Sequence, residues 1–423
     1  EIFKSLILKA FENFENKNIK FGGKIMKVLV INCGSSSAKF ELIDMTNEQS
    51  LAKGNCERIG IANPIFSYKN LLTGEKIDKM EVPMENHTVA VELILKTLQD
   101  EKIGVISTVD EIDSIGHRIV HGGEYYEKSV IVDDEVIKNL EEIAPLAPLH
   151  NPAHIMGIKV IQKLLPGKKN VVVFDTAFHQ TMPAKAYMYP YPYEDYTDLK
   201  VRKYGFHGTS HRYVSEVARE MLGKEDSKII VCHLGNGASI SAVQNGKVVD
   251  TSMGMTPLAG VMMGTRTGDA DPASVIYIMR KRGLSLDEMN TRMNKQSGIL
   301  GIFGESSDFR DLETAMKAGN ERAKLAYDMF CYRVKLYIGA YAAAMDGVDA
   351  IAFTGGIGEN GNNPRETICE GLGYLGLKFD SEKNKERVSG TVELSKPDSK
   401  VKVYKVETNE ELVIARDTYR LTK

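Results

Sequence analysis

The stretch that most constrains the fold is KVLVINCGSSSAKFELID, residues 27–44. Its apolar run at 28–31 predicts a short buried strand, and the small residues at 33–37 predict a turn. A second extended run, 38–44, follows the turn. The stretch therefore predicts a β-hairpin whose tip consists of a glycine and hydroxyl groups.

The same pattern occurs again further along the chain. Residues 229–243, IIVCHLGNGASISAV, also place an apolar strand before a glycine-rich tip and a returning strand. The likeness of these two stretches hints at an ancient duplication, although two copies are weak evidence. Residues 351–360, IAFTGGIGEN, begin with a third such strand and continue into glycines.

Helices are predicted between these strands. Apolar residues recur at helical spacing over 88–99 and 134–143. A long helix is predicted over 321–345, where five apolar residues fall near one face: Leu325, Met329, Leu336, Ala340 and Ala343.

Other local signals complete the pattern. Apolar runs predict strands at 113–120 and 171–174, Asn245-Gly246 predicts a two-residue hairpin turn, and the Tyr- and Pro-rich segment 183–192 predicts a loop. Because strands and helices alternate, the predicted class is α/β. Two halves that each open with a strand–turn–strand unit predict two related domains with a cleft between them, and nucleotide sites are often found in such clefts.

Length and composition exclude several classes of protein. A chain of 423 residues exceeds the size at which one hydrophobic core stops growing, so two domains are expected. A net charge of -3 with dispersed Lys and Arg argues against nucleic-acid binding, and no apolar stretch has the roughly 20 residues that span a bilayer. The cysteines form no CxxC pair, which favours a reducing cytoplasm: Cys33, Cys56, Cys232, Cys331 and Cys369.

Residues 1–25 are predicted not to belong to the fold. The chain starts with Glu1, and the strand pattern begins only after Met26. The segment FGGKIM, residues 21–26, can be encoded by a purine-rich ribosome-binding site. This favours upstream translation or an added segment over a surface helix or a targeting piece. We expect that removing the segment leaves fold and activity intact.

The three glycine-rich tips are candidates for phosphate binding. Phosphate oxygens need backbone N–H groups that approach closely, and only small side chains permit this approach. Each tip taken alone could be a plain turn, and neither of the first two matches a P-loop or a Rossmann fingerprint. Three such tips in one chain favour nucleotide binding.

Basic residues near glycines are candidates for binding anions. Arg118 ends an apolar strand within 116–123, GHRIVHGG, and Arg266 lies within 263–269, MGTRTGD. A planar guanidinium suits a carboxylate or a phosphate, although each arginine taken singly could form a structural ion pair. His207 lies between two glycines. Three other histidines, taken singly, are expected to be buried hydrogen-bonding residues: His150, His211 and His233.

Three carboxylates are candidates for the site, and two of them also have a purely structural interpretation. Asp175 ends a strand, a position typical of a carboxylate that orients a nucleophile or a metal-bound water. Glu410 and Glu411 follow Asn409 and could serve only to stabilise the start of a C-terminal helix.

Seven motifs together resemble the acetate kinase family. They are residues 28–37, 116–124, 174–179, 205–211, 233–239, 263–272 and 354–360. The resemblance is collinear from Met26 to the C-terminus, and seven motifs in order are highly specific. Cys33 departs from the family pattern, which usually has Ala or Ser there, but it exchanges one small residue for another.

The resemblance implies a fold and an activity. The family belongs to the actin-like ATPase superfamily, so two related ribonuclease H-like α/β domains with an interdomain active-site cleft are expected. The predicted division is 26–175 plus 408–423 for the N-terminal domain and 176–407 for the C-terminal nucleotide-binding domain. The implied protein is a homodimer that transfers a phosphoryl group reversibly and in line between ATP and acetate, giving acetyl phosphate and ADP. It would require Mg²⁺, or Mn²⁺ in its place.

The resemblance also assigns roles to single residues. Arg118 and Arg266 would flank the carboxylate and the migrating phosphoryl group, and His207 would stabilise that group. Asp175 would orient the carboxylate or a metal-bound water. Asn32 and Glu410 would hold the Mg²⁺, and the hydroxyls of Ser35 and Ser37 would assist. A larger set would bind ATP: Lys39, His233, Leu234, Gly235, Asn236, Gly237, Asp308, Phe309, Arg310, Gly356, Ile357, Gly358 and Asn360.

The acyl group would lie in a small pocket. Its expected neighbours are Arg118, Val120, Leu149, Phe206 and Pro257. Branched, aromatic and ring side chains make a stiff pocket that fits a methyl group, so acetate is expected to be preferred over propionate and butyrate. A propionate kinase of the same family is the alternative, because it would share most of the motifs.

Reaction chemistry separates this assignment from two rivals. A carboxylate is already anionic at neutral pH, so its phosphorylation needs no general base but does need positive charge around the transferring group. A sugar kinase needs a carboxylate to accept a hydroxyl proton, and Asp175 is a candidate, but two arginines at the acceptor disfavour it. An ATP-binding module without transfer chemistry would keep the glycine-rich tips and have no use for the arginine pair.

Overall fold

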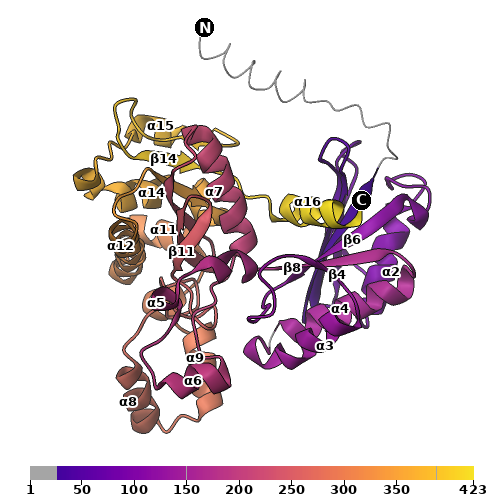
Figure 1. The fold of residues 1–423 in the computed structure, drawn as a ribbon, viewed down its shortest axis with the longest axis horizontal. Coiled ribbons are helices and arrows are strands. Elements are labelled where there is room, and N and C mark those ends of the chain that lie inside the picture. The colour runs from indigo at the N-terminus through magenta and orange to yellow at the C-terminus, as the bar shows by residue number, and fades with distance from the viewer. Residues whose placement is uncertain (1–25, 149, 387) are drawn as a thin grey trace.

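The computed structural model describes residues 26–148, 150–386 and 388–423. The predictions made for residues 1–25 and for Leu149 lie outside this part of the chain. The described residues form two lobes, each built around one β-sheet (Figure 1).

The first sheet contains eight strands and the second contains six. The strands of the first are β1 Lys27–Gly34, β2 Ser37–Asp44, β3 Gln49–Glu57, β4 Ile65–Asn70, β5 Lys76–Glu81, β6 Ile112–Ile119, β7 Val130–Ile131 and β8 Lys169–Phe174. Those of the second are β9 Lys228–Leu234, β10 Ala238–Gln244, β11 Lys247–Thr251, β12 Ala350–Thr354, β13 Val392–Glu393 and β14 Lys402–Lys405.

Helices cover both sheets. They are α2 His87–Leu98, α3 Asp134–Glu142, α4 Asn151–Leu164, α5 Ala184–Tyr187, α6 Tyr193–Leu199, α7 Gly208–Leu222, α8 Pro272–Arg282, α9 Leu286–Lys295, α10 Gly298–Phe303, α11 Phe309–Lys317, α12 Glu321–Ala344, α13 Gly355–Asn360, α14 Asn362–Cys369, α15 Ser381–Lys385 and α16 Glu410–Thr422. Short 3₁₀ segments lie at Val109–Glu111, Ala144–Leu146, Ala177–Thr181 and Leu372–Leu375. None of these described helices has the length and apolar character needed to cross a membrane.

The two sheets share the order of five strands. The first runs β5-β4-β3-β2-β1-β6-β8-β7 and the second runs β11-β10-β9-β12-β14-β13. In each, the first strand pairs antiparallel with its hairpin partner and parallel with the next crossover strand, which is β6 for β1 and β12 for β9. The order β3-β2-β1-β6-β8 therefore recurs as β11-β10-β9-β12-β14. This confirms the predicted class of two related α/β domains.

The central strands of each sheet are buried on both faces, as a near-continuous apolar strand requires, whereas β5 at the edge of the first sheet is largely exposed. Leu29 and Ile31 of β1 pack on the side of α2 and α4, whereas Val28 and Val30 pack with Ile414 of α16. In the second sheet, α7 covers one face and α12 covers the other.

The C-terminal helix α16 returns to the first sheet after the chain has completed the second. It packs on β1, β6 and β8 and also contacts α7 of the other lobe (Figure 1). Asp417 of α16 accepts hydrogen bonds from Ser129 at 2.6 Å and from Arg212 of α7 at 3.0 Å. The division at residues 175/176 and 407/408 stays a prediction.

Most local predictions are confirmed. Both hairpins form, and Asn245 and Gly246 have φ of 54° and 76°, which the predicted tight turn requires. The prediction of a loop over 183–192 is wrong in part, because Ala184–Tyr187 forms the short helix α5. Pro183 precedes its first turn, and Ala and Lys within it favour helix. The strands β3, β4 and β5 were not predicted, since Gly54 and many polar residues obscure their alternation.

Helix α12 shows a difference in orientation. Of the five apolar residues predicted to lie near one face, Leu325 and Leu336 are 52% and 47% exposed and Ala340 and Ala343 are also exposed, whereas Met329 packs against the core of the second lobe. The buried side instead contains Phe330, Val334 and Ile338. The helix is apolar on two sides, so periodicity alone did not show which side faces the sheet.

Candidate active site

The two arginines predicted from the sequence come from different lobes. Arg118 lies near the end of β6, and Arg266 lies in the loop between β11 and α8. Burial lowers the pKa of His207 and of His150, and both guanidiniums add to this effect. The four side chains are therefore within electrostatic range of one another.

Arg118 is held by a carboxylate at the end of the neighbouring strand. Its Nε donates to Asp175 Oδ1 at 3.0 Å and its Nη2 donates to Asp175 Oδ2 at 2.6 Å. Asp175 is 1% exposed, and its carbonyl accepts from the N–H of Gly208, the first residue of α7. Burial lowers the pKa of Arg118, but Asp175 and Glu410 outweigh this effect and raise it. Arg118 is thus a fixed cation at the junction of the two lobes.

Glu410 begins α16 beside this arginine. Its Oε2 lies 4.0 Å from Nε of Arg118. The helix is capped by Asn409, whose side chain accepts from the N–H of Leu412 at 3.0 Å, so the Glu410 carboxylate does not supply the cap. Burial, with the nearby Asp175 and Glu411 carboxylates, raises the pKa of Glu410 to about 7, against the opposing effect of Arg118 and Lys39.

The first hairpin faces the same carboxylate. Asn32 on β1 is paired in register with Lys39 on β2, and Lys39 is close enough to lower the pKa of Glu410. Within the described residues, no group of three or more His, Cys, Asp or Glu side chains is arranged to hold a metal. Mg²⁺ commonly takes one or two carboxylates and completes its shell with phosphate oxygens and water. The oxygen donors of Asn32 and Glu410 fit that type of site.

His207 lies at the second glycine-rich tip. A β-carbon placed on Gly237 would lie 3.5 Å from both Cε1 and Nε2 of His207 and 3.6 Å from Nη1 of Arg266. A side chain at Gly237 would therefore occupy the space between the imidazole and the guanidinium. His207 itself has φ 59° and ψ 24°, a left-handed conformation that is costly for a residue with a side chain.

The opposite ring nitrogen of His207 is bound to a buried hydroxyl. Its Nδ1 lies 2.8 Å from Ser239 Oγ, and its ring stacks on that of His233 with centroids 4.3 Å apart. Burial, followed by His233 and His211, lowers the pKa of His207 well below its ordinary value. The imidazole is neutral near pH 7.

Arg266 is positioned by the backbone around it. Its Nη1 donates to the carbonyl of Pro257 at 3.1 Å. Its loop is docked on the start of α10, where the N–H of Ile299 donates to Met263 O and the N–H of Leu300 donates to Gly264 O, both at 2.9 Å. Burial lowers the pKa of Arg266.

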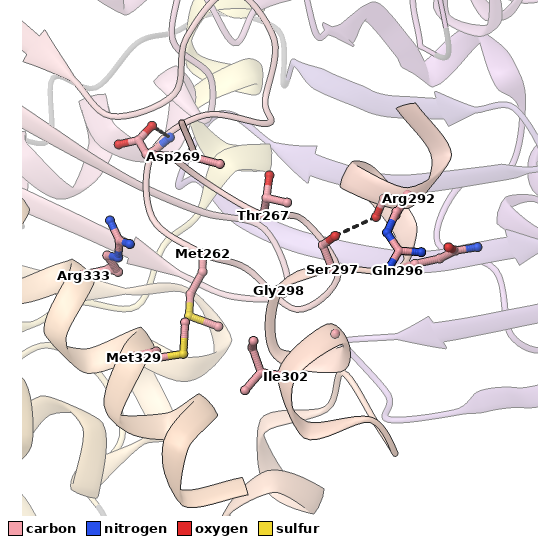
Figure 2. Close-up of a pocket in the computed structure, with 13 residues that line it drawn as sticks. Met262, Thr267, Asp269, Arg292, Gln296, Ser297, Gly298, Ile302, Met329 and Arg333 are labelled. Carbon is pink, nitrogen blue, oxygen red and sulfur yellow. Dashed lines mark hydrogen bonds between the residues drawn. The ribbon is translucent and has the colours of Figure 1, made fainter. Parts of the chain in front are cut away.

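A separate cavity of about 320 Å³ lies along this loop (Figure 2). It is lined by Thr267 and Asp269 of the loop, by Arg292 at the end of α9, and by Met329 and Arg333 of α12. Packing between the loop and these helices is therefore incomplete here.

Most of the predicted nucleotide-binding residues line one cavity. Its volume is about 590 Å³, of the size that holds a small molecule. Eight predicted residues contribute: Gly235, Asn236, Asp308, Phe309, Arg310, Gly356, Ile357 and Asn360. Ser307, Glu313 and Gly361 also line it and were not predicted. These three residues lie close to Asp308 or Asn360 in the sequence, and this closeness is the signal that could have identified them.

Other predicted residues lie beside or beneath this cavity. Leu234 is fully buried in the core, and Gly358 packs against the backbone of Phe353. His233 lies between the second tip and α7, with Nδ1 2.8 Å from Ser210 Oγ. These three residues therefore lie behind the cavity wall and not in its lining.

The described part of the expected acyl pocket is apolar. Val120 and Phe206 belong to one buried cluster, although they come from different lobes. The ring of His121 meets Phe206 edge-on at 5.6 Å. Pro257 is tied to the site through its carbonyl, which binds Arg266.

A duplicated α/β fold with a nucleotide-sized cavity and two half-buried arginines near a glycine-rich tip defines a class of ATP-dependent phosphotransferases. The sequence matches the model of the Acetokinase family over residues 27–416. This chain belongs to that family.

Relatives of known name agree with the family assignment. An acetate kinase of Fusobacterium nucleatum is 60% identical over 399 residues, which cover 94% of this chain and 100% of that protein. The crystal structure of an acetate kinase of Porphyromonas gingivalis, at 50% identity, has a TM-score of 0.90 and covers 94% of this chain and 100% of that one. A propionate kinase of Francisella tularensis, at 42% identity, has a TM-score of 0.88 with the same coverage.

Proposed function

We propose that this protein is an acetate kinase. A carboxylate oxygen of acetate attacks the γ-phosphorus of ATP in line, the bond from that phosphorus to the β–γ bridging oxygen breaks, and acetyl phosphate and ADP result. The reaction is reversible, because ATP can be re-formed by attack of ADP on acetyl phosphate.

The observation that carries this proposal is the convergence of Arg118, Arg266 and His207 beside the Gly237 tip. The transition state spreads negative charge over three equatorial oxygens, and an anionic acceptor adds a further charge. Two guanidiniums and an imidazole N–H are donors suited to that charge. Arg118 and Arg266 reach it from opposite lobes, so closing the lobes around substrate would complete the site.

Asp175 supports a carboxyl acceptor over a sugar hydroxyl. Both of its oxygens accept hydrogen bonds from Arg118. Protonating such a carboxylate would break a charge-assisted pair, so it is poorly suited to act as a general base. Its task is to orient the Arg118 guanidinium toward the acceptor.

We also propose that Asn32 and Glu410 hold Mg²⁺, directly or through water. When bound, the ion supplies positive charge to the phosphate oxygens. Glu410 is half-buried at 22% exposure of its side chain, and burial raises its pKa to about 7 although Arg118 and Lys39 oppose this effect. A bound cation would favour the ionised form. Mn²⁺, which also prefers oxygen ligands, would substitute.

Propionate kinase is the second candidate, because the Francisella propionate kinase is 42% identical. Val120 and Phe206 are 7% and 2% exposed and pack in one apolar cluster. This packing favours acetate.

A homodimer is proposed from the outer side of α12. Leu325, Tyr332 and Leu336 are about half exposed and recur at spacings of seven and four residues, which forms a stripe along the helix. A second copy of the chain is the occupant that a symmetric apolar stripe favours.

The five cysteines are free and buried, which supports a reducing, cytoplasmic location.

The test is the formation of acyl phosphate. The protein is incubated with ATP, Mg²⁺, hydroxylamine and one of acetate, propionate or glucose, and acyl hydroxamate and ADP are measured. Acetohydroxamate in excess over propionohydroxamate supports the proposal. A preference for propionate would select the second candidate, and ADP release with glucose alone would support a sugar kinase.

A further inference from the structure

Ser239 joins two histidine rings beneath the glycine-rich tip. Its Oγ lies 2.8 Å from Nδ1 of His207 and 2.7 Å from Nε2 of His211. Ser239 is on β10, whereas both histidines belong to the start of α7. Ser239 and His211 are fully buried. The Ser239 hydroxyl therefore links the His207 ring, which faces the proposed position of the phosphoryl group, to the His211 ring, which does not.

The single proton of a hydroxyl restricts this arrangement. Ser239 can donate to only one of the two ring nitrogens, so the other nitrogen must carry a proton and donate to Ser239. Two neutral arrangements result. In the first, His211 Nε2–H donates to Ser239 and Ser239 donates to His207 Nδ1. In the second, both hydrogen bonds run the other way.

The free nitrogen of His211 favours the first arrangement. Nδ1 of His211 is buried and has no hydrogen-bond partner within the described residues. In the first arrangement this nitrogen is an unprotonated acceptor, and in the second it is an N–H donor. Buried donors without a partner are rarer in proteins than buried acceptors without one.

The position of His207 favours the same arrangement. Its Nε2 edge faces Gly237 and Arg266, where the transferring phosphoryl group is proposed to lie. A proton on Nε2 would donate to that anion, whereas a lone pair on Nε2 would repel it. A doubly protonated ring is disfavoured, because burial, followed by the neighbouring histidines and arginines, lowers the pKa of His207 well below its ordinary value.

We propose that Ser239 and His211 are positioning residues that hold His207 as its Nε2–H tautomer, through hydrogen bonds that run from His211 Nε2–H to Ser239 and from Ser239 to His207 Nδ1. This inference rests on the proposed function, since it names residues that orient a donor of the same site. Neither residue touches substrate.

The chain offers a matched control two residues along the same strand. Ser241 is also fully buried on β10, and its Oγ lies 3.1 Å from Nε2 of His179 and 2.8 Å from Thr251 Oγ1. Ser241→Ala removes a histidine-bound hydroxyl of the same type without touching His207. A general effect of losing a buried hydroxyl would appear in both variants.

The direct test is the tautomer of His207 in protein labelled with [¹⁵N]histidine. Two-bond proton–nitrogen spectra distinguish the protonated ring nitrogen from the unprotonated one, and the His207 signals are assigned by their loss in His207→Asn. We expect the Nε2–H form in wild type and in Ser241→Ala, and a mixture of tautomers in Ser239→Ala. An Nδ1–H form in wild type would overturn the proposal, as would an unchanged tautomer in Ser239→Ala.

Kinetics provide the second readout. Ser239→Ala should lower kcat by about 10- to 100-fold, less than the loss of a whole oxyanion donor, with KM values for acetate and ATP little changed. His211→Gln keeps an N–H donor and should retain most activity, whereas His211→Met should resemble Ser239→Ala. Equal activity in the two His211 variants would overturn the proposal. This pair also decides the matter if Ser239→Ala does not fold.

The outcomes separate this inference from the proposed function. If wild type forms no acyl phosphate, the proposed function fails whatever the spectra show. If wild type is active and the spectra show the Nδ1–H tautomer, only the inference fails.

Discussion

Arg118 and Arg266 reach the same region but are supported in different ways. Arg118 has two hydrogen bonds to the buried carboxylate of Asp175, whereas among the described residues the Arg266 guanidinium has one oxygen partner, the carbonyl of Pro257. Fewer N–H groups of Arg266 are therefore engaged by the protein, and we expect Arg266 rather than Arg118 to bind the transferring phosphoryl group.

Replacing Arg266 by Ala should lower kcat far more than it weakens ATP binding. Loss of a donor aimed at transition-state charge typically costs about 100- to 1,000-fold in rate. Arg266→Lys should restore only part of the rate, because the planar fork is lost. Steady-state kinetics and equilibrium ADP binding provide the measurement, with Arg282→Ala on the exposed face of α8 as control. Near-normal turnover of Arg266→Ala would remove this residue from the mechanism.

Shortening Val120 should change the choice of acid. Val120 is 7% exposed and packs in the same cluster as Phe206, so Val120→Ala opens room for one further methylene. One methylene is worth about 1–3 kcal/mol of discrimination, so the acetate-to-propionate ratio of kcat/KM should fall by roughly tenfold or more. An unchanged ratio would show that Val120 does not line the acyl pocket. Val217→Ala on α7, outside this cluster, serves as control.

At the scale of elements, α12 presents apolar side chains in two directions. Its inner side contains Phe330, Val334 and Ile338, and its outer side exposes Leu325 and Leu336. Contiguous apolar surface on a monomer is commonly an interaction site. The outer stripe therefore marks the element through which two copies are proposed to associate.

A charge in this stripe should separate the copies. Leu336→Glu would place a carboxylate in the apolar contact, and in a symmetric dimer the charge would appear twice. We expect sedimentation velocity to show a shift from dimer to monomer at micromolar concentration. Met221→Glu on α7, at a residue that is 41% exposed, should leave the dimer intact. A wild-type protein that sediments as a monomer would exclude the homodimer itself.

At the scale of the whole molecule, buried histidines make stability depend on pH. Burial lowers the pKa of His117 and His121 to about 4 and that of His154 and His179 to about 3. These rings are neutral in the folded protein, whereas in the unfolded chain they take up protons below pH 6.5. Their stabilising contribution is therefore complete above pH 6.5 and is lost as the pH falls toward 4.

The unfolding temperature should follow this linkage. It should be nearly constant above pH 7 and fall steeply below pH 6.5, since each such histidine costs about 1.4 kcal/mol at pH 5.5. Four of them together approach the total stability of an ordinary domain. Calorimetry between pH 8 and pH 4.5 is the measurement. His117→Gln should reduce the proton uptake on unfolding by about one, and a flat profile would contradict the assignment.

The sequence by itself predicted the repeated strand–turn–strand units, the α/β class and the family. These features are local: apolar runs form strands, and glycine-rich turns close them, wherever they occur in a chain. Eight residues that line the cavity of about 590 Å³ were assigned to ATP by the family resemblance, and among them only the glycine-rich tips were also indicated by the local pattern.

Only the tertiary structure decided which distant groups meet. Arg118 and Asp175 lie 57 positions apart, and their pairing depends on β6 and β8 being neighbours in the sheet. The hydroxyl of Ser239 reaches His207 and His211 only because β10 and α7 pack in one lobe. The outward side of α12 is likewise set by the sheet that covers its other side. Periodicity shows that a helix has an apolar side, but the neighbour that buries this side is determined by the packing of the whole chain.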